Sequence, residues 1–121
     1  MNSKKTLVIG ASTNPERYAY KAVVKLKHYH HDVIALGLKA GEIDGLNIET
    51  EKKQLANLDT ITLYVSAKNQ EEYIPYIQSL HPKRVIFNPG TENPDLYPIL
   101  NNNGIETLEA CTLVLLSVGN F

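Results

Sequence analysis

The chain has 121 residues, of which 43% are hydrophobic and 21% are charged, as is usual for one globular domain. A formal net charge of −1 argues against a nucleic-acid-binding module, which needs a basic face. The single cysteine excludes a disulfide within the chain. Neither a signal peptide nor an apolar segment of the ~20 residues that span a bilayer is apparent. We therefore expect one cytoplasmic domain over residues 1–121, without nucleic-acid or membrane partners.

The first predicted strand, Thr6–Ile9, leads into a turn that suits an anion. The turn reads Gly10-Ala11-Ser12-Thr13, and only its first glycine matches the three glycines of a dinucleotide-binding fingerprint. Asn14 suits a helix N-cap and Pro15 the first helical position, so a helix is predicted over residues 15–29. Free N–H groups and the positive end of the helix dipole would favour a phosphate here.

The charge of Arg17 supports the same interpretation. A cation in the first turn of a helix is disfavoured by the helix dipole, and a bound phosphate would explain its presence. The alternative is an ordinary strand-to-helix connection that carries a solvated arginine.

The second predicted strand, over residues 32–36, bears on which ligand is bound. A NAD-binding domain normally carries an acidic residue about 20 residues beyond its glycines, to hold the ribose hydroxyl. This chain continues Gly37-Leu38-Lys39, with no acid. Lys39 would favour a ligand with an additional phosphate, either NADP or coenzyme A. A solvated loop lysine is the competing explanation.

The remaining patterns predict three strands and three further helical segments. The strands cover residues 60–65, 84–87 and 105–108. The helices cover residues 69–80, with a bend at Pro75, residues 93–102, closed by Gly104, and a short helix or coil over residues 111–118. Residues 37–45 are expected to form a glycine-rich loop, and residues 51–57 are expected to hold one helical turn.

Strands that alternate with helices and are almost wholly apolar indicate a parallel sheet covered on both faces. The predicted fold class is therefore α/β, a doubly wound Rossmann-like domain with about five parallel strands. In such folds the ligand binds beyond the carboxyl ends of the strands. Five segments follow the predicted strands there: residues 10–14, 37–39, 66–68, 88–91 and 109–111.

The candidates for catalysis are weak. Cys111 lies near the predicted ligand edge, but no histidine can be placed beside it, which favours a small buried hydrophobe over a nucleophile. The histidines at 28, 30 and 31 end the first helix, where polar residues are common, and are not spaced as a metal site. His81 and Asp59 precede strands and so belong to the opposite edge. The sequence thus predicts a binding site with no catalytic residues and no metal.

The chain resembles a known family, that of small stand-alone CoA-binding domain proteins. These are relatives of the N-terminal domain of the succinyl-CoA synthetase alpha subunit. The resemblance covers essentially the whole chain and is carried by several motifs: Gly10-Ala11-Ser12-x-x-Pro15-x-Arg17, Tyr20, Asn88-Pro89-Gly90-Thr91-Glu92-Asn93, Gly104-Ile105-Glu106 and Glu109-Ala110-Cys111-Thr112-Leu113.

The resemblance implies a site residue by residue. The phosphates of CoA would be held by Gly10, Ala11, Ser12, Thr13 and Arg17. Lys39 would lie near the ribose phosphate or adenine. The pantetheine arm would be bordered by Val65, Ser66, Asn88, Pro89 and Gly90.

The predicted function is binding of CoA or an acyl-CoA, without catalysis. Synthetase activity is not implied, because the further domain and subunit that it needs do not fit within 121 residues. Two alternatives stay open: a small NADP-binding oxidoreductase, and a partner-binding domain with a vestigial nucleotide pocket. A homodimer or an unidentified protein partner is also left open.

Overall fold

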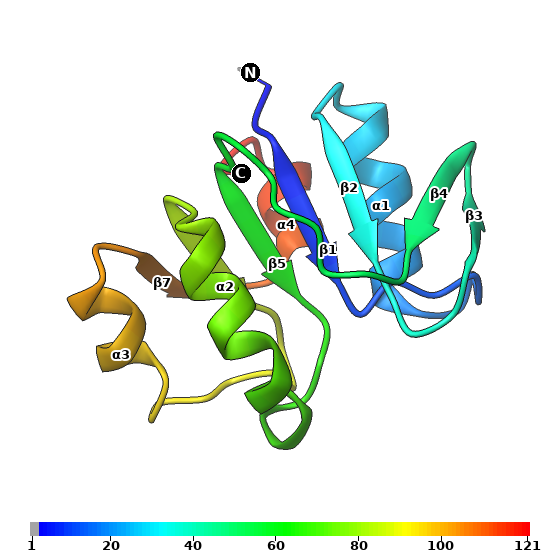
Figure 1. Ribbon diagram of the computed structural model, residues 1–121. Helices are drawn as coiled ribbons and strands as arrows, with labels where there is room; N and C mark the ends of the chain where they lie inside the picture. Colours follow the sequence, from blue (N-terminus) through cyan, green and yellow to red (C-terminus); the bar gives the residue numbers. More distant parts are fainter. Residues whose placement is uncertain (1–2) are drawn as a thin grey trace.

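A single mixed sheet organises residues 3–121, which are the residues described in the computed structural model (Figure 1). Its strand order is β3-β4-β2-β1-β5-β6-β7, and every neighbouring pair is parallel except β3 and β4. The strands are β1 (Thr6–Ile9), β2 (Val33–Leu36), β3 (Gly41–Ile43), β4 (Leu46–Glu49), β5 (Thr60–Leu63), β6 (Arg84–Phe87) and β7 (Glu106–Glu109). The five predicted strands are all present, and the α/β Rossmann-like fold is confirmed.

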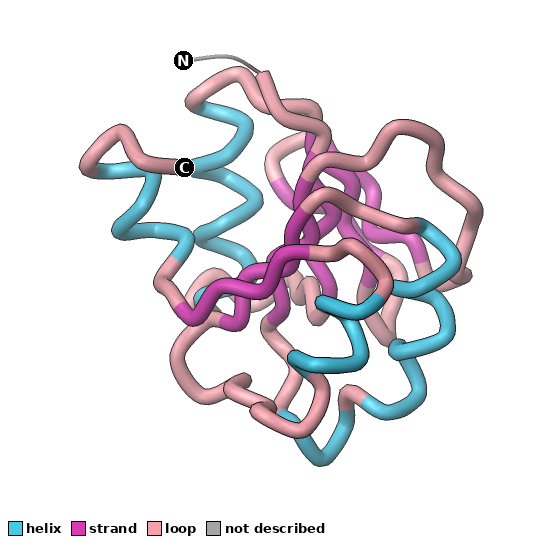
Figure 2. Tube along the Cα trace, turned by 90° about the vertical axis from the view of Figure 1, so that its left-hand side faces the viewer, coloured by secondary structure: helices cyan, strands magenta, loops and turns pink. Residues whose placement is uncertain are grey.

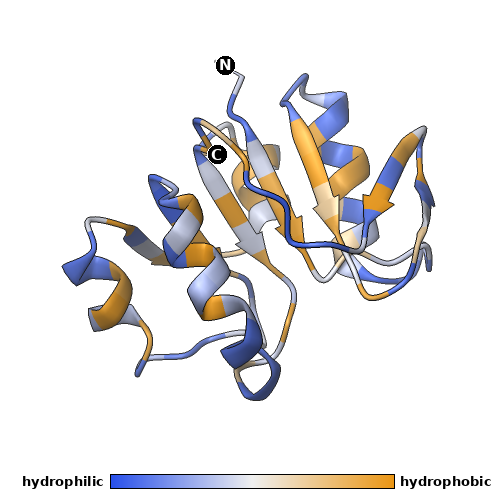
Figure 3. Cartoon of the chain, viewed as in Figure 1, coloured by the Kyte–Doolittle hydropathy of each residue, from blue (hydrophilic) through white to orange (hydrophobic). Residues whose placement is uncertain are grey.

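Helices cover both faces of the sheet, as Figure 2 shows edge-on. One face carries α1 (Tyr18–His28) and α4 (Thr112–Ser117), which contact each other. The other carries α2 (Ile74–Leu80) and α3 (Tyr97–Asn102). Alternate residues of β1 enter the two cores: Leu7 and Ile9 pack with α2 and α3, and Val8 packs with α1 and α4. Burial on both faces explains why the central strands β1 and β2 are mostly apolar (Figure 3).

The two strands that the sequence analysis missed form a hairpin where a crossover helix would usually lie. β3 and β4 are joined by Asp44-Gly45, both with positive φ (49° and 83°), as a two-residue hairpin turn requires. β4 then pairs parallel with β2. The prediction of a glycine-rich loop over residues 37–45 was therefore wrong for its second half, and residues 51–57 contain no helix.

The first helix begins three residues later than predicted. Arg17 is the N-cap of α1 and has extended backbone angles (φ −78°, ψ 140°), so Pro15 is not the first helical residue. Asn14 caps a turn rather than the helix, because its Oδ1 accepts a hydrogen bond from the Glu16 amide (3.0 Å). The correction leaves a longer loop between β1 and α1.

The segment after β5 is also less regular than predicted. Two 3₁₀ turns, η1 (Ala67–Asn69) and η2 (Glu71–Tyr73), precede α2. Pro75 lies in the first turn of α2, where its missing N–H breaks no helical bond, so the predicted bend is absent. The predicted closure of the next helix is confirmed, because Gly104 has φ +78° and Ile105 N–H donates to the Leu100 carbonyl.

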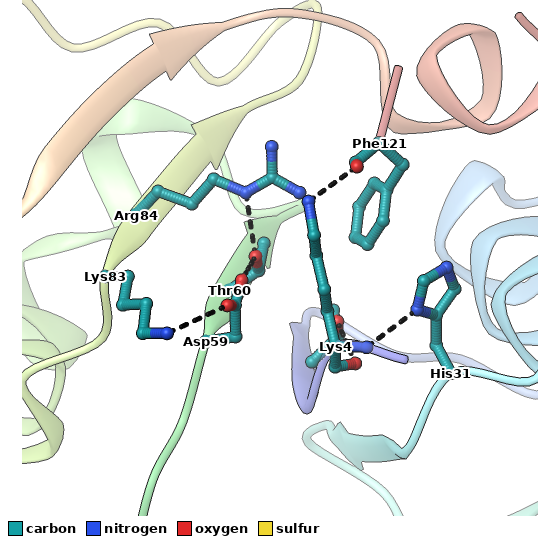
Figure 4. Close-up of polar contacts among 8 residues, drawn as sticks. Lys4, His31, Asp59, Thr60, Lys83, Arg84 and Phe121 are labelled. Carbon is teal, nitrogen blue, oxygen red and sulfur yellow. Dashed lines mark hydrogen bonds and ion pairs between the residues drawn. The ribbon is translucent and has the colours of Figure 1, made fainter. Parts of the chain in front are cut away.

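A polar cluster at the amino edge of the sheet surrounds the ring of Phe121 (Figure 4). His31 is 6% exposed, and its Nδ1 accepts a hydrogen bond from the Lys4 amide (3.0 Å). Its ring packs edge-to-face on Phe121, with 4.9 Å between centroids. Burial, together with the positive charges of Lys4 and Arg84, lowers the pKa of His31, and Asp59 only partly opposes this.

Acidification is expected to destabilise the protein through His31. The unfolded chain has the ordinary pKa of 6.5 and takes up a proton more readily than the folded chain. The contribution of neutral His31 to stability is therefore complete above pH 6.5 and declines as the pH falls below that value. Urea unfolding on either side of pH 6.5 would measure this decline.

The matched variants are His31→Gln and His28→Gln, the second at an exposed position on α1. His31→Gln is expected to flatten the pH dependence and His28→Gln to leave it unchanged. An unaltered pH profile in His31→Gln would contradict the assignment.

Candidate functional site

The loop after β1 lies at the carboxyl edge of the sheet, and its start is fixed by β2. The amides of Gly10 and Ala11 both donate to the Leu36 carbonyl oxygen, each at 2.9 Å. These two amides are therefore occupied, whereas the sequence analysis expected free N–H groups in this turn. The amides of Ser12 and Thr13 have no hydrogen-bond partner among residues 3–121. Two adjacent free amides remain for an anion.

Ser12 and the start of α1 supply further donors. Ser12 Oγ accepts a hydrogen bond from the Asn14 amide (3.1 Å), so its own proton is left to donate. The first intrahelical acceptor is the Arg17 carbonyl, to which the Lys21 amide donates (3.2 Å). The amides that precede Lys21 in α1 are thus open, as at any helix N-terminus. Together these groups favour a negatively charged ligand.

Three glycines allow neighbouring strands to approach this loop. A Cβ on Gly10, whose φ is +99°, would lie 2.8 Å from the Tyr64 carbonyl oxygen at the end of β5. A Cβ on Gly37 would lie 2.3 Å from the Ala11 carbonyl oxygen, and one on Gly41 would lie 2.4 Å from Thr13 Cγ2. The loop therefore fits between the ends of β2, β3 and β5 only because these side chains are absent.

Cations that make neither an ion pair nor a side-chain hydrogen bond gather at the same edge. Of the 12 lysines and arginines, eight make an ion pair or donate a side-chain hydrogen bond within residues 3–121. The remaining four are exposed and lie in the loops after β1, β2 and β5 or in the first turn of α1: Arg17, Lys21, Lys39 and Lys68. The sequence analysis did not single out Lys21 and Lys68.

Asn88, at the end of β6, serves the fold with all of its side-chain polar groups. It is 2% exposed, and its Nδ2 donates to Thr62 Oγ1 (2.7 Å) and to the Leu63 carbonyl (2.8 Å). Its Oδ1 accepts from the Thr112 amide at the start of α4 (2.8 Å). The side chain thus joins β5, β6 and α4, and all of its polar groups are used within the protein.

The residues after Asn88 form a tight turn at the surface. The Thr91 amide donates to the Asn88 carbonyl (2.9 Å), with Pro89 and Gly90 between them and φ +92° at Gly90. Pro followed by a positive-φ glycine is the pattern of a type II turn. Pro89 and Gly90 are both exposed and so are accessible to a ligand.

Gln70 is a buried residue beneath the candidate site that the sequence analysis did not single out. It is fully buried, and its Nε2 donates to the Val65 carbonyl (2.8 Å) and to the Thr91 carbonyl (2.7 Å). Its Oε1 accepts from Asn93 Nδ2 (3.0 Å). The loops after β5 and β6 are thereby connected through one side chain. A polar residue inside a helical pattern was the only signal in the sequence.

The other polar groups near this edge include a tyrosine, a cysteine and a glutamate. Burial raises the pKa of Tyr64 to about 12, so its hydroxyl stays protonated at neutral pH. Cys111 is half-buried at the N-cap of α4. Glu109 accepts a hydrogen bond from the Tyr97 hydroxyl (2.7 Å). His31 and His81 lie at the amino edge, and no group of three His, Cys, Asp or Glu residues within 3–121 is placed to hold a metal.

The predicted site residues are therefore brought to one edge. Gly10, Ala11, Ser12 and Thr13 follow β1, Lys39 follows β2, and Val65 and Ser66 follow β5, next to β1 in the sheet. Asn88, Pro89 and Gly90 follow β6. No helix within residues 3–121 is both long and apolar enough to cross a membrane.

Similar solved structures share this fold. One, described only as an uncharacterized protein, has 50% sequence identity and a TM-score of 0.97, with 100% of each chain covered. A hypothetical protein from Pyrococcus horikoshii OT3 has 24% identity and a TM-score of 0.80, over 93% of this chain and 80% of that one. A dinucleotide-forming acetyl-coenzyme A synthetase 1 from Ca. Korarchaeum cryptofilum has 18% identity and a TM-score of 0.71, over 89% of this chain and 26% of that one.

No curated protein sequence matches the chain. A family model does: that of the CoA binding domain, which matches residues 4–117. The match includes every strand and helix of the sheet domain described above. The chain therefore belongs to the CoA binding domain family.

Proposed function

We propose that the protein binds CoA or an acyl-CoA across the carboxyl edge of its sheet and catalyses no reaction there. The observation that carries this proposal is the position of the four cations that make no ion pair or side-chain hydrogen bond, all of them near this edge. CoA carries a diphosphate and a separate ribose phosphate, so it needs several cations spread over more than one loop. The family supports the same ligand.

The nucleotide end of the ligand is assigned to the loops after β1 and β2. The free amides of Ser12 and Thr13, the Ser12 hydroxyl and the Arg17 guanidinium would hold the diphosphate. Lys39 would meet the ribose phosphate. Gly10 and Ala11 would contribute close backbone approach rather than N–H donors, because their amides are occupied by Leu36.

The pantetheine arm is assigned to the loops after β5 and β6. Val65 and Ser66 would border one side of the arm, and Pro89 and Gly90 the other. Asn88 would act indirectly, because its hydrogen bonds to Thr62 and Leu63 hold the ends of β5 and β6 at a fixed distance. The absence of catalysis is part of the proposal: no histidine lies at this edge among residues 3–121, and the buried Tyr64 hydroxyl stays neutral.

CoA is expected to raise the thermal unfolding midpoint of the wild-type protein, because a ligand that binds only the folded state stabilises it. Arg17→Ala is expected to weaken CoA binding by roughly 1–3 kcal/mol, the scale of a charge-assisted contact. Calorimetric titration would measure both proteins, with Lys83→Ala as the control. Lys83 is a cation at the opposite edge, with its side chain 82% exposed.

Equal CoA affinity in wild type and Arg17→Ala would remove Arg17 from the site.

Competition by NADP or NAD tests the identity of the ligand. CoA is expected to displace both, and NAD is expected to bind poorly because no acid follows β2. Tighter binding of NADP than of CoA would overturn the proposal in favour of an oxidoreductase.

A further inference from the structure

The two loops proposed to border the pantetheine arm lie beyond the end of the sheet. The backbone ladder between β5 and β6 ends at the pair Leu63 and Phe87. Val65 lies two residues after Leu63 in the segment that follows β5, and Thr91 lies four residues after Phe87 in the segment that follows β6. Ladder hydrogen bonds no longer fix the distance between the two segments at that point.

Gln70 connects the two segments beyond the end of the ladder. Its one amide nitrogen donates to a carbonyl of each segment, Val65 at 2.8 Å and Thr91 at 2.7 Å, and has no further proton to give. The amide oxygen is held in turn by Asn93 Nδ2 at 3.0 Å, which fixes the orientation of the group. Every polar atom of the side chain is therefore used, inside a fully buried environment.

We propose that Gln70 is a positioning residue that sets the spacing of the loops after β5 and β6, and through it the fit of the pantetheine arm. The inference rests on the proposed binding of CoA. Gln70 itself touches no ligand, because it is fully buried. Its effect is expected mainly on the arm, since the bonds from the Gly10 and Ala11 amides to the Leu36 carbonyl do not involve Gln70.

Two ligands separate the arm from the nucleotide. CoA contains both parts, whereas adenosine 3′,5′-bisphosphate has the nucleotide end without the pantetheine. Calorimetry would measure both affinities for the wild type, Gln70→Leu and the control Gln54→Leu. Gln54 is an exposed glutamine whose Nε2 donates to Ser79 Oγ (3.2 Å) in another part of the chain.

Gln70→Leu removes both hydrogen bonds between the two loops. It is expected to weaken CoA binding about tenfold and to leave the affinity for adenosine 3′,5′-bisphosphate unchanged. A purely structural role would lower the unfolding midpoint without changing the ratio of the two affinities. An unchanged ratio in a folded Gln70→Leu protein therefore overturns the inference. Failure of the wild type to bind either ligand would instead overturn the proposed function.

A second variant covers the case in which Gln70→Leu does not fold. Asn93→Ala removes only the partner of the Gln70 oxygen and leaves both bridging bonds in place. It is expected to weaken CoA binding selectively, by a smaller factor than Gln70→Leu. Equal affinity ratios in Asn93→Ala and wild type would then overturn the inference.

Discussion

Replacing Asn88 with alanine is expected to lower the free energy of unfolding by roughly 3 kcal/mol or more. The variant loses three hydrogen bonds at once and leaves the Leu63 carbonyl and the Thr112 amide buried without partners. Water does not reach these groups easily, because Thr62 and Thr112 are fully buried beside them. Urea unfolding of the variant and the wild type would measure the loss.

Two matched variants define what Asn88 contributes. Asn103→Ala removes an exposed asparagine with one bond to the Ile99 carbonyl and is expected to cost little. Asn88→Asp keeps the acceptor for Thr112 but places a second carboxylate oxygen against the Leu63 carbonyl, so it is expected to destabilise at least as strongly as alanine. If Asn88→Ala were no less stable than Asn103→Ala, the network would have no energetic role.

Gly37→Ala is expected to be the most damaging small substitution near the site. Its Cβ would lie 2.3 Å from the Ala11 carbonyl oxygen and 3.0 Å from Ile48 Cγ2, and a backbone oxygen cannot move aside alone. We expect a loss of at least about 3 kcal/mol in stability, the upper range for overpacking. CoA-dependent stabilisation should also disappear, because the displaced segment leads directly to Ser12 and Thr13.

Gly104→Ala is the control for this prediction. Gly104 has φ +78° but nothing within 4 Å of a Cβ, so the substitution incurs only the backbone penalty of about 1–2 kcal/mol. Thermal unfolding with and without CoA would compare the two variants. Gly104→Ala should retain its response to CoA, and an equal response in Gly37→Ala would show that the close approach of the two loops does not matter.

Much of the fold could be predicted from local patterns. The apolar runs around Val8, Ile61 and Ile86 mark the central strands because a parallel sheet buries both faces. The β3–β4 hairpin was missed because its strands, of three and four residues, are interrupted by polar residues and give no apolar run. Its one clear mark was Asp44-Gly45. The start of α1 was misplaced because Asn14 caps a turn, and the sequence of a capped turn resembles that of a capped helix.

The candidate site was predictable to the level of its loops. Their position follows from topology alone, since segments after parallel strands meet at one edge. The roles of Asn88 and Gln70 were not predictable, because their partners are distant in the sequence. Asn88 bonds to Thr62 and Gln70 bonds to Thr91, 26 and 21 residues away. The occupied amides of Gly10 and Ala11 likewise depend on Leu36, in another strand.

The internal hydrogen bonds of Asn88 and Gln70 distinguish the loops after β5 and β6 from the loop after β2. Ordering a free loop costs about 1–2 kcal/mol of conformational entropy per residue. The loops after β5 and β6 are already held by internal hydrogen bonds in the folded protein, so a ligand would not have to order them. The tip after β2 has fewer internal contacts, since Leu38 is 84% exposed and Lys39 has no ion pair or side-chain hydrogen bond among residues 3–121. In the proposed complex, selectivity between ligands of different shape would therefore come from the loops after β5 and β6, and tolerance of different anionic groups from the loop after β2.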